Sequence, residues 1–243
     1  MKISLLQTPT APLNLAIHGG LERVELCELD FLERSGHSAS LTVANLQGFD
    51  PRIHVIRDWG YRNRLLKFKY YLEFGLRNRR SNIFHGHYTP ILALLYPKRA
   101  LVHFHGLAVA ELIQYQRFKT RYHRARYVFC AQWVRDHFVQ RYPEIPPDHL
   151  HVLHNGVDIE SFVPAHRSRS TPVNICFYAG WIPEKGIYVV LEAAEILEKK
   201  RKDFILWFGG SAKSHYKDSK WGDSREIDEK VRSWAGRLST VKL

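Results

Sequence analysis

The sequence predicts an α/β protein with a doubly wound, Rossmann-like amino-terminal domain and an incomplete second Rossmann-like domain. Short apolar runs alternate with helical patterns along the 243 residues, as in βαβ units that build a parallel sheet. The segment 164–172 is polar, basic and bounded by prolines, which is typical of a linker. The residues after it suffice only for a small sheet. We therefore expect domains at 1–163 and 173–243, joined by the linker 164–172.

The first unit opens with the clearest strand and helix patterns. Ile3–Leu6 is a buried strand by its apolar run, and Glu22–Arg34 has apolar residues at helical spacing. Gly36 ends this helix, because glycine suits the left-handed position just past a helix end. Ala39–Val43 is then the next strand of the same sheet.

The remaining elements follow the same rhythm. Further strands of the first sheet are expected at Ile53–Ile56, Ile83–His87, Leu101–His105, Tyr127–Ala131 and His151–Leu153. The second unit is expected to run strand, helix, strand, helix and the start of a strand: Asn174–Ala179, Gly186–Lys199, Phe204–Phe208, Arg225–Trp234 and Val241–Leu243.

The composition describes a basic globular protein of a reducing compartment. There are 36 Lys and Arg against 24 Asp and Glu, a formal net charge of +12, which favours polyanionic partners without choosing among nucleic acid, anionic lipid and sugar diphosphate. The cysteines, Cys27, Cys130 and Cys176, stand far apart and form no CxxC pair. A disulfide framework and a cysteine-based zinc site are therefore not expected.

The apolar stretches are short everywhere. The run before Pro9 is too brief for a signal peptide, and the longest stretch, Pro90–Tyr96, falls far below the roughly 20 residues that cross a bilayer. We expect a cytoplasmic protein that does not span a membrane.

Four motifs stand in a recognisable order: Gly19–Val24, His103–Gly106, His154–Asp158 and Ala179–Gly186. In residue type and spacing they resemble glycosyltransferase family 4. The resemblance implies the GT-B fold, with two Rossmann-like domains on either side of a cleft. It also implies a nucleotide diphosphate sugar as donor substrate, with no further cofactor and no metal.

The expected donor-binding residues lie at two helix starts. Gly19 and Gly20 precede a helix whose amino-terminal N–H groups favour an anion, although a double glycine is also an ordinary tight turn. By the resemblance, Gly180 and Lys185 contact the diphosphate; the alternative is a solvated helix start. Trp181 replaces an arginine of the family, so it cannot neutralise phosphate but offers a face that stacks on a base or sugar.

The expected catalytic residue is His105, which ends a strand at the carboxyl edge of the sheet, where open α/β folds hold ligands. The resemblance places it against the transferred sugar and makes Asn155 a donor contact. We expect His103 on the opposite side of the strand or within the sheet. A metal site formed by His85, His87 and His105 is an alternative, but the resemblance implies none.

The segment 57–80 predicts a basic surface helix. Leu65, Phe68, Leu72 and Leu76 recur at helical spacing beside basic residues, the pattern of a helix that rests on anionic lipid. The alternative is that this apolar stripe packs on the sheet. A second basic cluster lies at 117–124, and no nucleic-acid-binding signature accompanies either cluster, so nucleic acid is not an expected partner.

Two functions follow from these features. The first is a retaining hexosyltransferase of cell-envelope polysaccharide biosynthesis that uses a membrane-associated glycan or glycolipid acceptor, peripheral on the inner face of the membrane. The second is a non-catalytic remnant that binds glycan or anionic membrane. The family's late Glu-x7-Glu motif is not matched by Glu226 and Glu229. We therefore expect weak or no activity from the 243-residue chain alone.

Overall fold

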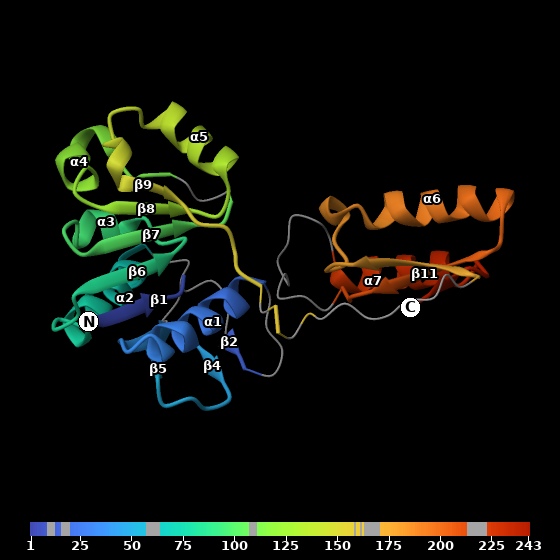
Figure 1. Cartoon of the computed structure of the whole chain (residues 1–243), viewed down its shortest axis with the longest axis horizontal. Coiled ribbons are helices and arrows are strands. Elements are labelled where there is room, and N and C mark those ends of the chain that lie inside the picture. Colours follow the sequence, from blue (N-terminus) through green and yellow to red (C-terminus); the bar gives the residue numbers. More distant parts are fainter. Residues whose placement is uncertain are drawn as a thin grey trace. The chain divides into compact units, whose positions relative to one another are not determined.

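The computed structural model describes residues 1–8, 13–15, 20–56, 64–106, 111–157, 159–160, 162, 171–212 and 223–243, with the backbone alone at 64–67. The chain divides into two compact units, Met1–Ile159 and Glu160–Leu243, which are the blue-to-yellow and orange-to-red parts of Figure 1. Most of the expected linker 164–172 lies outside the described residues. Each unit is an α/β layer structure of its own.

The first unit is built on a parallel seven-stranded sheet with the order β5-β3-β1-β6-β7-β8-β9. The strand order reverses between β1 and β6, which confirms the predicted doubly wound topology. The strands are β1 Lys2–Leu6, β3 Ser38–Val43, β5 Ile53–Val55, β6 Ile83–His87, β7 Ala100–Phe104, β8 Arg126–Phe129 and β9 Leu150–Val152, with β2 Leu13–Asn14 and β4 Leu46–Gln47 forming a separate pair.

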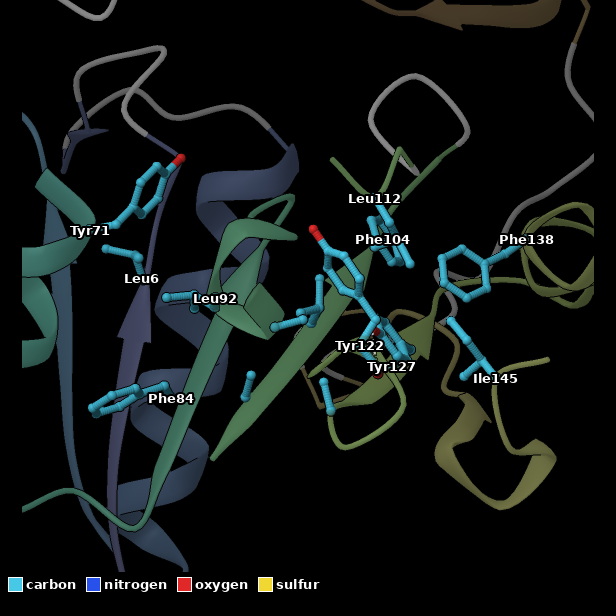
Figure 2. Packing of buried hydrophobic residues seen from close by; sticks show 14 of the residues in the cluster. Leu6, Tyr71, Phe84, Leu92, Phe104, Leu112, Tyr122, Tyr127, Phe138 and Ile145 are labelled. Carbon is cyan, nitrogen blue, oxygen red and sulfur yellow. Dashed lines mark hydrogen bonds between the residues drawn. The ribbon is translucent and has the colours of Figure 1, made fainter. Parts of the chain in front are cut away.

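Helices cover the two faces of this sheet unequally. Side chains from four helices and from one face of the strands form the larger core, whose members include Leu6, Phe84 and Phe104 (Figure 2). Helix α1 packs through Leu29 on the opposite face, against Leu5 and its neighbours. Leu5 and Leu6 point to different cores because strand side chains alternate. The helices are α1 Gly20–Arg34, α2 Arg64–Arg77, α3 Ile91–Leu95, α4 Tyr115–Tyr122, α5 Gln132–Arg141 and the 3₁₀ turn η2 Pro147–His149.

Helix α2 turns a different face to the core than the apolar stripe suggests. Tyr70, Tyr71 and Phe74 are buried, whereas Phe68, Leu72 and Leu76 are 42%, 40% and 73% exposed; these last three side chains are named the α2 stripe below. Tyr70, Tyr71 and Phe74 pack in the larger core of the first unit, and their large apolar side chains orient α2 with this face toward the sheet. The alternative that the stripe packs on the sheet is therefore wrong for its described part.

The second unit is a parallel three-stranded sheet with the order β10-β11-β12. Its core includes Phe208, Ile187 and Val231, and strand β10 is largely exposed. The elements are β10 Val173–Tyr178, η3 Pro183–Lys185, α6 Ile187–Lys200, β11 Phe204–Gly209, α7 Ser224–Ala235 and β12 Val241–Lys242.

Element ends differ from the sequence expectations by one or two residues. Strand β8 ends at Phe129 instead of Ala131, because Ala131 is already the residue that precedes the first turn of α5. No helix in the described part of the chain combines the length and the apolar composition that crossing a bilayer requires.

Candidate functional site

The carboxyl ends of β6 to β9 meet along one edge of the first sheet. Backbone hydrogen bonds continue past the strands: Cys130 N–H donates to Phe104 O at 3.0 Å, and Leu153 N–H donates to Phe129 O at 2.9 Å. The residues directly after β8 and β9 are therefore fixed by the same hydrogen-bond pattern as the strands. His105 follows β7 at this edge.

His105 is held from two sides. Its Nε2 lies 2.9 Å from Nδ1 of His87, and a hydrogen bond with Asn155 also acts on its ring. Burial, followed by the charges that His87 and His85 would carry, lowers the pKa of His105 to about 4. The imidazole is therefore neutral near pH 7, where it hydrogen-bonds a hydroxyl without adding a charge.

The loop after β9 brings Asn155 to His105. His154 Nδ1–H donates to the carbonyl oxygen of Cys130 at 2.9 Å, which ties the loop to the neighbouring strand end. The structure thus brings together two of the residues singled out from the sequence, His105 and Asn155. Phe162, just before the segment 164–172, is exposed and therefore is not a buried anchor for that segment.

The amino terminus of α1 lies at the same edge. Gln7 directly follows β1, and its Nε2 donates to Oε2 of Glu25 at 2.9 Å, so the first turns of α1 stand over the strand ends. Gly20 is the first residue of α1, and a Cβ built on it would meet no atom within 4 Å. Among the described residues, none therefore covers the start of this helix at Gly20. Gly19 lies outside the described residues.

A polar cluster lies under α1, beside the predicted site. Glu28 Oε1 is 2.5 Å from His85 Nδ1, and Glu28 Oε2 is 3.1 Å from His87 Nε2. Burial acts to raise the pKa of Glu28, but the contacts with His85 and His87 outweigh it and hold the pKa well below its usual range. Glu28 is thus a carboxylate, which sequence reasoning missed although it lies one helical turn after Glu25.

His103 belongs to the same cluster, which corrects its expected placement. Its ring centroid lies 4.0 Å from that of His105 and 5.4 Å from that of His87. Residues two apart in a strand point to the same face, so His103 and His105 share one side of β7. Sequence reasoning also did not identify Tyr88, the residue that directly follows β6. It has a φ of 52°, rare for a bulky residue, and its ring lies 5.5 Å from that of His105.

In the second unit, the candidate residues lie between β10 and α6. Gly180 is exposed, and no described residue lies within 4 Å of a Cβ built on it; Lys185 ends η3 just before the start of α6. Among the described residues Lys185 has no ion-pair partner. Gly210 lies beside this loop with a φ of 122°, where a side chain would collide with the carbonyl oxygen of Ala179.

Trp181 takes a different role from the stacking surface expected for it. The side chain is 2% exposed, and its ring centroid lies 5.7 Å from that of Phe208 in the core of the second unit. Arg232 of α7 lies against the outer side, with Cζ 5.4 Å from the ring centroid. Trp181 therefore anchors the loop that carries Gly180 and does not offer a free aromatic face.

The amino-terminal edge of the first sheet also has a hollow, of about 460 Å³. Arg52 lines it and pairs with Asp30, Glu33 and Asp50. Because the guanidinium is already occupied by three carboxylates, and because open α/β sheets hold ligands at the opposite edge, we assign this hollow no site.

Comparison with known proteins gives one family and a set of similar folds. The sequence profile of Glycosyltransferase Family 4 matches residues 18–161, more than half of the chain. No match was found among curated protein sequences.

Two solved structures illustrate the fold similarity. WaaG, a glycosyltransferase involved in lipopolysaccharide biosynthesis, matches with a TM-score of 0.63 and 13% identity over 99% of this chain and 69% of that chain. The catalytic domain of starch synthase IV from Arabidopsis thaliana, bound to ADP and acarbose, matches with a TM-score of 0.67 and 14% identity over 99% and 73%. At these identities the likeness shows the fold alone, which is of the GT-B type.

Glu25 generates a pH-dependent prediction. Burial, reinforced by the charge of Glu22, raises the pKa of Glu25 well above its usual value, so the folded protein keeps a proton that the unfolded chain releases near pH 4.3. The free energy of unfolding therefore decreases as the pH rises from about 4.3 through the pKa of Glu25 in the folded protein. Glu25→Gln keeps the contact with Gln7 but cannot ionise. The difference in free energy of unfolding between this variant and the wild type, measured by urea denaturation, should therefore increase in favour of the variant between about pH 5 and 8.

The matched control for this series is Glu192→Gln, on the exposed side of α6, which should follow the wild-type pH profile. If the Glu25→Gln and wild-type curves stay parallel across that range, the buried carboxyl is ionised in the folded protein and our interpretation is incorrect.

Proposed function

The chain belongs to glycosyltransferase family 4, and from this premise we propose that it transfers a hexose, with retention, from a nucleotide diphosphate sugar to a membrane-associated glycan or glycolipid. The observation that carries the proposal is His105, a neutral imidazole held between His87 and Asn155 at the carboxyl edge of the sheet. In this family's architecture the donor sugar lies against that edge.

The neutral state of His105 suits the proposed chemistry. Glycosyl transfer passes through a transition state in which the sugar gains oxocarbenium-like positive charge. A protonated histidine would repel that charge, whereas a neutral one hydrogen-bonds a sugar hydroxyl and orients the ring. The low pKa of His105, about 4, supports this role throughout the physiological range.

The donor diphosphate is assigned to the second unit. Lys185 is an exposed cation without an ion-pair partner among the described residues, and it stands directly before the amino terminus of α6. The first N–H groups of a helix lack intrahelical acceptors and favour anions. Together with the open backbone at Gly180, they offer a pyrophosphate two kinds of donor. In the first unit, Gly20 offers a second open helix start.

The membrane-associated acceptor is supported by the α2 stripe. Phe68, Leu72 and Leu76 are exposed on one helix, and Lys69 and Arg77 are exposed beside them. An apolar stripe flanked by cations is the pattern of a helix that lies in an anionic lipid surface. The same stripe supports the alternative, a non-catalytic module that binds anionic membrane.

The first test concerns the reaction itself. The purified chain, incubated with a panel of nucleotide sugars and lipid-linked acceptors, should release nucleoside diphosphate only slowly, and His105→Ala should slow this release by about a further 100-fold. His137→Asn, on the exposed side of α5, is the control and should be unaffected. A rate unchanged in His105→Ala would contradict the assigned role. Vesicle binding without turnover of any sugar would favour the non-catalytic module.

The second test concerns the diphosphate. Lys185→Ala should weaken the binding of nucleoside diphosphates, measured by calorimetry, by roughly 10- to 100-fold, because it removes a charge-assisted contact of about 1.5–3 kcal/mol. Lys199→Ala, near the other end of α6, is the matched control and should bind like the wild type. Equal affinities in the two variants would remove Lys185 from the donor site.

The third test concerns the membrane. The double variant Leu72→Ser and Leu76→Ser should lose most of the salt-sensitive sedimentation with vesicles that contain anionic lipid, because binding scales with buried apolar area. Ile196→Ser, at an exposed apolar residue of α6 outside the α2 stripe, provides the control. If the double variant sediments like the wild type, the stripe does not contact lipid.

A further inference from the structure

The most unusual group of side chains in the first unit is the polar cluster under α1. Glu28, His85, His87 and His103 each offer one ligand atom, and these four atoms lie within 4.8 Å of one another. They come from three elements: α1, β6 and β7. His87 and His103 are register partners, so their side chains emerge on the same face of the sheet.

The cluster leaves buried nitrogens without hydrogen bonds. His103 is 4% exposed, and within the described part of the chain neither of its ring nitrogens has a hydrogen-bond partner. Nε2 of His85 is also unpartnered among the described residues, whereas Nε2 of His87 lies 3.1 Å from Oε2 of Glu28. Each unsatisfied buried group costs about 1–3 kcal/mol. A cation held at the centre would bind one nitrogen of each imidazole and so remove part of this cost.

The donor set indicates which cation fits. Three imidazoles and one carboxylate are the ligands of Zn²⁺ and neighbouring first-row ions, whereas Mg²⁺ and Ca²⁺ prefer oxygen alone. Glu28 is the most exposed member and opens the cluster to solvent.

The geometry points to a site that needs little rearrangement. A tetrahedral zinc with bonds of about 2.0–2.1 Å separates its ligand atoms by roughly 3.4 Å, so ligand atoms that lie up to 4.8 Å apart would approach one another by at most about 1.4 Å. We propose that Glu28, His85, His87 and His103 bind one divalent transition-metal ion of the Zn²⁺ class. The ion would tie α1 to the two central strands.

Such an ion would also position His105. Nε2 of His87 faces Glu28, and its Nδ1 faces Nε2 of His105 at 2.9 Å. A His87 bound to metal through Nε2 carries its proton on Nδ1 and donates it to His105. His105 then keeps its own proton on Nδ1, which fixes one tautomer. This second step rests on the proposed function of His105, whereas the metal site does not.

The test uses the full chain, stripped with a chelator and titrated with Zn²⁺ in a calorimeter. One ion per chain should bind, and Co²⁺ in its place should give the intense visible absorption of a four-coordinate site. Glu28→Gln and His103→Asn should each lower the affinity by at least about tenfold, while His137→Asn on α5 should leave it unchanged.

Three outcomes would overturn the site. They are the absence of stoichiometric binding, wild-type affinity in both cluster variants, and a Co²⁺ spectrum of six-coordinate, solvent-like character, which would mean an adventitious ion only. Circular dichroism establishes that each variant is folded. If His103→Asn does not fold, the zinc affinity of Glu28→Gln and the Co²⁺ spectrum decide whether the metal site exists.

The positioning step has its own readout. Nitrogen-15 shifts of His105 should show an unprotonated Nε2 in the zinc-loaded chain and a mixture of tautomers in the stripped chain. Identical tautomer populations in the two samples would contradict the claim that the ion positions His105. The zinc titration would still test separately whether the four side chains bind a metal ion.

Discussion

The parallel pairing of β6 with β7 is the constraint on which the candidate chemistry depends. In this register His87 lies opposite His103, so the imidazoles of both strands emerge on one face, the face that α1 covers. On the opposite face of the sheet, β6 packs closely against the segment that begins α3. A side chain at Gly86 would collide with Thr89 and Leu92, so only glycine lets the segment at the start of α3 approach β6 this closely. A slip by one residue would exchange the two faces.

Helix α1 serves both the core and the polar cluster. Leu29 packs among the apolar residues of the outer strands, while Glu25 and Glu28 reach toward the strand ends. Buried carboxyls are costly unless they are neutral or paired. The two glutamates avoid the cost of an unpaired buried charge in different ways. The raised pKa of Glu25 favours its neutral form, and the contacts with His85 and His87 favour the ionised form of Glu28. Neighbours one turn apart thus adopt opposite charge states.

The loop between β10 and α6 in the second unit contains one buried residue that fixes it and exposed residues that a ligand can reach. Trp181 fills the core and packs on Phe208, while Gly180 and Lys185 on either side of it stay exposed. In place of a family arginine, this chain has a buried aromatic ring with the guanidinium of Arg232 against it. The loop between β10 and α6 is therefore held by packing, and the charge it offers to a ligand is that of Lys185.

The sequence by itself determined the fold class, the order of the elements and the family, because apolar periodicity and short motifs are local properties of the chain. It also placed His105 at a strand end. Only the tertiary structure decided that Glu28 and His103 join His85 and His87, that Trp181 is buried and that the α2 stripe is exposed. These outcomes depend on which faces meet across strands and helices distant in sequence, and periodicity within one element does not specify its partner.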